Sequence, residues 1–74
     1  MAGTDAKDAV GTTEAAMDTD PRVGLRAVAA LRRLVERLEA LQVDNARRLG
    51  WSWEEIGAQL GVSRQAVHKK HARR

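Results

Sequence analysis

The sequence has 74 residues, a formal net charge of +3, two histidines and no cysteine. A chain this short forms one small domain at most, whose core needs support from a partner chain or a ligand. The absence of cysteine excludes disulfides and thiolate metal sites, and the length excludes an enclosed substrate pocket, so we expect neither an enzyme nor a cofactor.

Charge is divided unevenly along the chain. Residues 1–20 carry one lysine against five acidic residues, whereas residues 21–74 carry twelve Lys or Arg against five acidic residues. A basic domain favours a polyanionic partner, although charge alone leaves nucleic acid, a membrane surface and an acidic protein open. No apolar stretch approaches the ~20 residues that cross a bilayer, and the acidic start is unlike a signal peptide, so we expect a cytoplasmic, nucleoid-associated protein without membrane contact.

Residues 1–19 contain few sizeable apolar side chains, mainly Val10 and Met17. Such a segment buries too little surface to offset the entropy of ordering, so we expect a disordered acidic arm. The arm is either a solvated tail without a role or a competitor of DNA for the basic part of the chain.

Residues 20–50 predict one long amphipathic helix that serves in packing or dimerisation. Asp20 is a suitable N-cap before Pro21, and Gly50 is suited to a left-handed C-terminal position. Because Gly24 weakens the first turn, we expect the ordered helix to begin nearer Leu25.

Apolar residues of this helix recur with helical spacing on one side. They include Val28, Leu31, Leu34, Val35, Leu38 and Leu41. Leu31, Leu34, Leu38, Leu41 and Asn45 also alternate as the a and d positions of paired helices. The simplest expectation is that this stripe covers the helices that follow. A helix of this length spans ~38 Å, however, so surface left over near Leu31 and Leu34 predicts a homodimer through the N-terminal half.

Residues 51–74 predict two short helices joined by a tight turn. Ser52 and Glu55 fit a capping box, Gly61-Val62-Ser63 fits a three-residue turn, and Ser63 is suited to cap a third helix over 64–73. A helix-turn-helix needs glycine at the turn and a small residue where its helices touch, and Gly61 and Gly57 fill those positions. Apolar contacts come from Ile56, Leu60, Val62 and Val67. We therefore expect an all-α fold of three helices.

The run WSWEEIGAQLGVSRQAV, residues 51–67, resembles the helix-turn-helix in region 4 of sigma-70-type factors. It is even more similar to small actinobacterial regulators that carry the same signature. The resemblance covers about the last 24 residues and implies DNA binding with the third helix in the major groove. His71 stands where these motifs usually have an apolar residue, so we expect the last turn to fray. The other sigma regions are missing, which argues against a sigma factor.

The third helix is basic, and its first turns are suited to base edges. Arg64 can bond guanine in bidentate fashion and Gln65 can pair with adenine. The base-reading candidates are Arg64, Gln65, His68 and Lys69, and the phosphate candidates are Ser52, Ser63, Lys70, Arg73 and Arg74. Solvated first-turn residues remain the simpler interpretation of Arg64 and Gln65, but a basic residue there opposes the helix dipole, which favours a ligand role.

The remaining candidates have simpler explanations. Trp53 is expected to anchor the second helix on the first, whereas Trp51 suits either a nucleic-acid backbone or a partner chain. His68 and His71 lack a third metal ligand nearby in sequence. The favoured function is a sequence-specific DNA-binding transcriptional regulator acting on double-stranded DNA. The alternatives are a protein-interaction module, binding transcription machinery through helix 25–49, and a non-specific nucleoid-type DNA binder.

Overall fold

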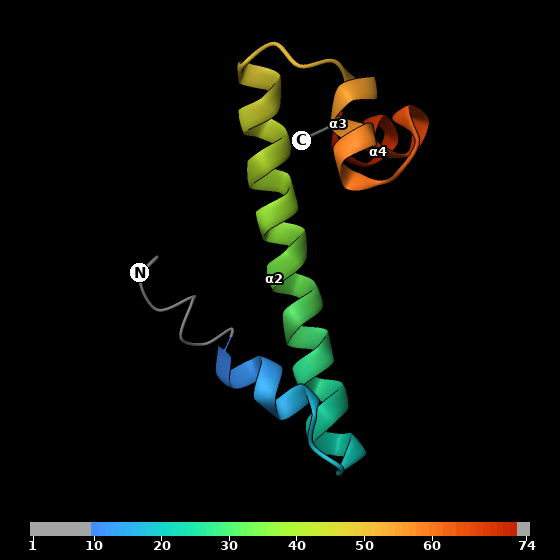
Figure 1. Ribbon diagram of the computed structural model, residues 1–74. Coiled ribbons are helices and arrows are strands. Elements are labelled where there is room, and N and C mark those ends of the chain that lie inside the picture. The colour runs from blue at the N-terminus through green and yellow to red at the C-terminus, as the bar shows by residue number, and fades with distance from the viewer. Residues whose placement is uncertain (1–9, 73–74) are drawn as a thin grey trace. The chain divides into compact units, whose positions relative to one another are not determined.

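The computed structural model describes residues 10–72, and all regular secondary structure in that stretch is helical (Figure 1). Residues 10–16 form a short helix. It is followed by α2 (Pro21–Arg48), α3 (Trp53–Leu60) and α4 (Arg64–His71). The expected all-α class is therefore confirmed. Contacts divide the chain into two compact units, Met1–Arg37 and Leu38–Arg74, with the division inside α2. Within residues 10–72, no helix combines the length and apolar character needed to span a bilayer.

The helix at residues 10–16 corrects the expectation of a disordered arm; residues 1–9 of that expectation lie outside the described stretch. Small residues explain the difference. Gly24 and Ala27 of α2 are buried, and the carbonyl oxygens of Ala16 and Asp18 come within 3.6 Å of the place that a Cβ on Gly24 would take. Close approach of two backbones buries surface without large side chains. The number of described helical segments is accordingly one greater than the three expected.

Local hydrogen bonds determine where α2 begins and where it ends. The Asp20 carboxylate accepts from the Arg22 N–H at 3.0 Å, and the helix begins at Pro21, one turn earlier than the expected Leu25. At the other end Gly50 adopts the predicted left-handed conformation, with φ 87°. The N–H of Gly50 donates to the Arg47 carbonyl and that of Trp51 to the Ala46 carbonyl, both at 3.0 Å, which closes the helix.

The core of the second unit consists of Val43, Ile56 and Val67, with Ala46 and Trp53 packed against it. One residue of this core comes from each of α2, α3 and α4. The expectation that the leucine stripe of α2 covers α3 and α4 is wrong for Leu38 and Leu41, which are 50% and 57% exposed, because Val43 and Ala46 provide the core contact. Val43 lies on the side of α2 opposite Leu41, because two residues after Leu41 the helix has turned by ~200°.

Exposed apolar side chains occur in both halves of α2, and Val35 in the N-terminal half is 58% exposed. Leu31 and Leu34 are half-buried in the first unit, and Val28 and Val35 are exposed. The most exposed leucines of the stripe itself lie further along, at Leu38, Leu41 and Leu49. The helix at residues 10–16 lies against the start of α2, where Gly11 and Ala15 line one open hollow with Ala27 and Ala30.

Candidate nucleic-acid interface

A glycine fixes how closely α3 approaches the turn that precedes α4. A Cβ placed on Gly57 would lie 2.8 Å from the Val62 carbonyl oxygen and 3.3 Å from the Arg64 nitrogen. Backbone atoms cannot move aside as a flexible side chain can, so only glycine fits here. The predicted small residue is thus at the point of contact, where it sets the position of the first residue of α4.

Both short helices begin at a serine, as predicted. The Ser52 hydroxyl accepts from the Glu55 N–H at 3.1 Å, and the Ser52 N–H donates to the Glu55 carboxylate at 2.8 Å, which completes the capping box. Gly61 ends α3 in the left-handed conformation with φ 74°. The Ser63 hydroxyl accepts from the Ala66 N–H at 3.0 Å, so it caps α4. Both serines that were candidates for phosphate contact therefore have structural roles as caps.

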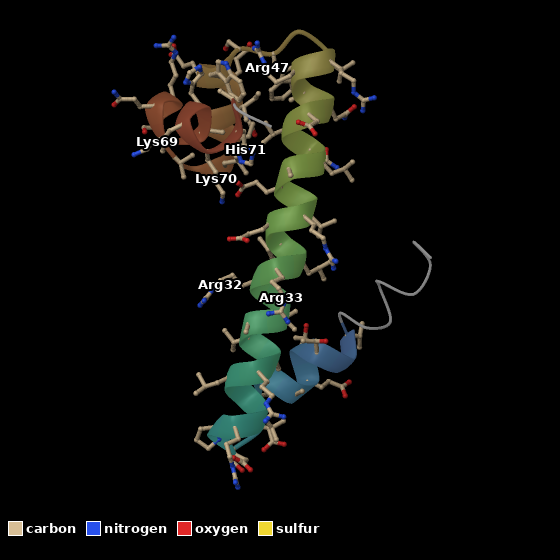
Figure 2. The ribbon with its side chains drawn as sticks, turned by 180° about the vertical axis from the view of Figure 1, so that it is seen from behind. Arg32, Arg33, Arg47, Lys69, Lys70 and His71 are labelled. Atoms are coloured by element: carbon tan, nitrogen blue, oxygen red, sulfur yellow. The ribbon has the colours of Figure 1, made fainter. Side chains whose placement is uncertain are left out.

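Two side chains anchor α4 to the rest of the second unit. Val67 is buried in the core, and His71, one turn later, is buried as well. The four base-reading candidates, Arg64, Gln65, His68 and Lys69, are exposed. Figure 2 shows His71 and Lys69 on different sides of α4. Since Arg64–His71 contains no acidic residue, the exposed side of this helix is cationic.

His68 is exposed but held in place. Its ring meets that of Trp53 edge-on, with the ring centroids 5.2 Å apart and the planes at 88°. Trp53 itself packs against the core, as predicted. The direction of the His68 ring is therefore set by α3, which makes it a less adaptable base-reading residue than Arg64 or Gln65.

The end of α4 is fixed by Glu39 of α2. One oxygen of the Glu39 carboxylate lies 2.6 Å from His71 Nε2 and 3.0 Å from Lys70 Nζ. Hydrogen bonds from Lys70 and, second, from His71 hold the pKa of Glu39 below its ordinary value. The expected fraying at His71 is wrong, because this buried imidazole has a carboxylate partner and α4 extends to it. His71 Nδ1 is buried without a hydrogen-bond partner among the described residues.

The remaining candidates for phosphate contact are Lys70 and the last two residues of the chain. Because Lys70 pairs with Glu39, contact with a phosphate requires it to leave or share that carboxylate. Arg73 and Arg74 lie outside the described residues.

Arg47 is a cationic residue near α3 that sequence analysis did not single out. Its guanidinium lies 4.6 Å from the centroid of the Trp53 ring and donates to the Trp51 carbonyl at 2.7 Å. Figure 2 shows Arg47 beside the start of α3. The cation–π contact and the hydrogen bond together hold a positive charge close to the capped N-terminus. The signal that the sequence offered for this role was the position of Arg47 at the end of a helix, four residues before Trp51.

An apolar cavity of about 220 Å³ lies within the second unit, between the end of α2 and α3. Its apolar lining includes Val43, Ala46, Leu49, Ile56 and Leu60. Within residues 10–72 no three His, Cys, Asp or Glu side chains are placed to share a metal ion. Comparison with known proteins adds no relative: no family model, no curated protein and no solved structure matches this chain.

Proposed function

We propose that the chain is a sequence-specific DNA-binding transcriptional regulator, in which α3 and α4 act as a helix-turn-helix and α4 enters the major groove. The observation that carries the proposal is the two-sided character of α4. Val67 and His71 hold one side to the protein, and the other side exposes Arg64, Gln65 and Lys69 without an acidic residue in the helix. A buried anchor and a cationic, hydrogen-bonding outer surface are what a groove-reading helix requires.

Close packing at Gly57 supports the same function. Base recognition requires side chains held within about 0.5 Å of their productive positions, which in turn requires a rigid backbone. The Gly57–Val62 approach restrains the turn before α4. The Ser63 cap restrains the start of α4, and the Glu39–His71 bond restrains its end. These contacts stabilise a short helix, and they also hold the backbone at Arg64 and Gln65 in a fixed position, which a helix that only attracts phosphates does not require. This restraint favours base reading over a non-specific nucleoid-type role, and a cytoplasmic, nucleoid-associated location follows from the proposal.

Arg64 and Gln65 are the residues through which the proposal is tested. Duplexes bound by the full chain are first selected from a random pool, and affinities for the recovered and a random duplex are then measured at one salt concentration. Arg64→Ala should weaken binding to the recovered duplex by ~1–3 kcal/mol and relax the preference at one base position. Gln65→Ala should do the same at a neighbouring position.

Arg26→Ala is the matched control, because it removes the same charge from an exposed arginine of α2. It should lower both affinities to a small and equal extent. A random pool that yields no motif would contradict sequence reading and support non-specific binding. Failure to bind any duplex at low salt would contradict DNA binding altogether.

A further inference from the structure

A row of exposed residues follows the last turns of α2 inside the second unit. Leu38, Leu41, Asn45 and Leu49 recur at spacings of three and four residues and so share one side of the helix. Three of them are leucines that are 50%, 57% and 70% exposed. We refer to these four residues as the α2 seam. The core contact with α3 and α4 uses Val43 and Ala46 instead, so it does not occupy the α2 seam.

The α2 seam continues into the apolar cavity of the same unit. Gln42 and Asn45 of α2 and Leu49, directly after its end, line that cavity, and Leu60 of α3, itself 41% exposed, lines it from the other side. The exposed apolar surface is therefore broader than one row of side chains. Large leucines gathered in this way are typical of an interface and costly to leave in water.

We propose that the α2 seam binds a second copy of this chain, with the two α2 helices parallel and related by a twofold axis. Asn45 is the reason for choosing an identical partner. It lies between Leu41 and Leu49, so any helix that covers the leucines also covers its amide. An apolar residue of a foreign helix would leave that amide unpaired, which costs free energy.

In the parallel arrangement each Asn45 meets Asn45 of the other copy. An amide both donates and accepts, so one can satisfy an identical amide across a twofold axis. Arg48 donates to Asn45 Oδ1 at 3.4 Å, and an amide oxygen has a second lone pair for the partner. A single asparagine at an a position is a known means of fixing register and pair number in coiled helices. The four residues of the α2 seam carry no charge, and the guanidinium of Arg48, which comes next in the same a/d alternation, must point aside for two copies to meet.

This inference goes beyond the proposed function, because it concerns a surface on α2 rather than the exposed side of α4. It places the homodimer contact further along α2 than the one expected near Leu31 and Leu34. Two copies would present two α4 helices, as twofold regulators do on paired half-sites.

The oligomeric state of the full chain tests the proposal by sedimentation equilibrium between one and several hundred micromolar. We expect a reversible dimer at tens of micromolar and its loss in Leu41→Glu, with the far-ultraviolet circular dichroism unchanged. Leu25→Glu is the matched control, since Leu25 is 69% exposed on the same helix but lies off the α2 seam. A monomer throughout, or an equal loss of dimer in both variants, would overturn the proposal.

The parallel register has its own test, because the chain contains no cysteine. Asn45→Cys should form an intermolecular disulfide on mild oxidation, and Leu25→Cys should not, since only thiols facing each other come within bonding reach. A dimer in which both variants cross-link equally slowly would overturn the parallel pairing. Duplex binding separates the two proposals: a parent that is monomeric yet binds its selected duplex overturns only the dimer, and a dimer that binds no duplex overturns only the DNA function.

Discussion

At the scale of single residues, two positions decide where α4 lies. Gly57 permits a close backbone approach between α3 and the turn before α4, and Glu39 ties the last turn of α4 to α2. Neither residue is large or apolar. Gly57 acts by leaving room for the Val62 carbonyl, and Glu39 acts by bonding both Lys70 and His71.

Gly57→Ala is expected to destabilise the fold although alanine is the better helix former. The added Cβ would lie 2.8 Å from the Val62 carbonyl oxygen, and the resulting overpacking costs about 1–3 kcal/mol, more than the ~1 kcal/mol gained in helix propensity. Urea denaturation followed by circular dichroism measures the free energy of unfolding. Gly11→Ala is the control, because Gly11 is also helical but has open space at its Cβ position. Equal or greater stability of Gly57→Ala would contradict the close approach.

Glu39→Gln is expected to lower the free energy of unfolding by about 1–2 kcal/mol at neutral pH, because it removes the charge that Lys70 and His71 bond. The pKa of Glu39 is lowered in the fold, so its carboxylate stabilises the protein above the ordinary value of 4.5. That stabilisation is lost as the pH falls through the lowered pKa.

Parent and Glu39→Gln should therefore differ in thermal midpoint at pH 7 and converge as the pH drops well below 4.5. Glu36→Gln, a change of an exposed glutamate on the same helix, provides the comparison. A difference between parent and Glu39→Gln that stays constant down to strongly acidic pH would rule out the charged contact as its source.

At the scale of elements, α4 is too short to be stable by itself. Isolated helices under ~12 residues are marginal in water, and α4 has eight residues. Its stability comes from the Ser63 cap, the burial of Val67 and the bond between His71 and Glu39. The same cap lies at the end of α4 that would approach a phosphate, so stability and binding must be separated experimentally.

Ser63→Ala and Ser63→Asp together separate them. Alanine removes the hydroxyl that accepts from the Ala66 N–H and should cost ~1 kcal/mol of stability. Aspartate keeps an acceptor at the cap and suits the helix dipole, so stability should be retained. Its negative charge should nevertheless weaken duplex binding on the order of tenfold at low salt, by repelling phosphate. Fluorescence anisotropy with a labelled duplex measures this, and unchanged affinity for Ser63→Asp would place the DNA away from this helix end.

At the scale of the whole molecule, charge is the property that matters most for a DNA partner. The net charge of +3 combines an acidic first twenty residues with a basic remainder. Cations that contact phosphates displace counterions from the duplex, and the number displaced sets how steeply affinity falls with salt.

Three phosphate contacts, from Lys70, Arg73 and Arg74, would give a slope of about −2.7 for the logarithm of the binding constant against the logarithm of salt concentration. Lys70→Ala should make the slope less steep by at most ~0.9, and by less if Glu39 keeps part of its hold on the ammonium. Arg22→Ala, which changes an arginine paired with Asp20 at the start of α2, should leave the slope unchanged. Affinity independent of salt would exclude phosphate contacts by these residues.

Features that depend on neighbours within a few residues could be predicted from the sequence. Asp20, Ser52 and Ser63 cap the helices as expected, and Gly50 and Gly61 end them in left-handed conformations. Each of these is a local matter, because a helix end needs hydrogen-bond partners that only nearby side chains and backbone can provide. The basic, exposed character of α4 and the apolar role of Val67 could also be predicted from the sequence of this helix.

Only the tertiary structure decided which side of α2 receives α3 and α4. Periodicity identifies an apolar side but not what covers it, and the side chosen carries Val43 rather than the leucines of the α2 seam. The Glu39–His71 bond joins residues 32 apart in the sequence, and no local rule brings them together. The helix at residues 10–16 depends likewise on small residues meeting small residues. Local bonding thus determined where helices begin and end, whereas packing between distant segments determined which surfaces remain exposed.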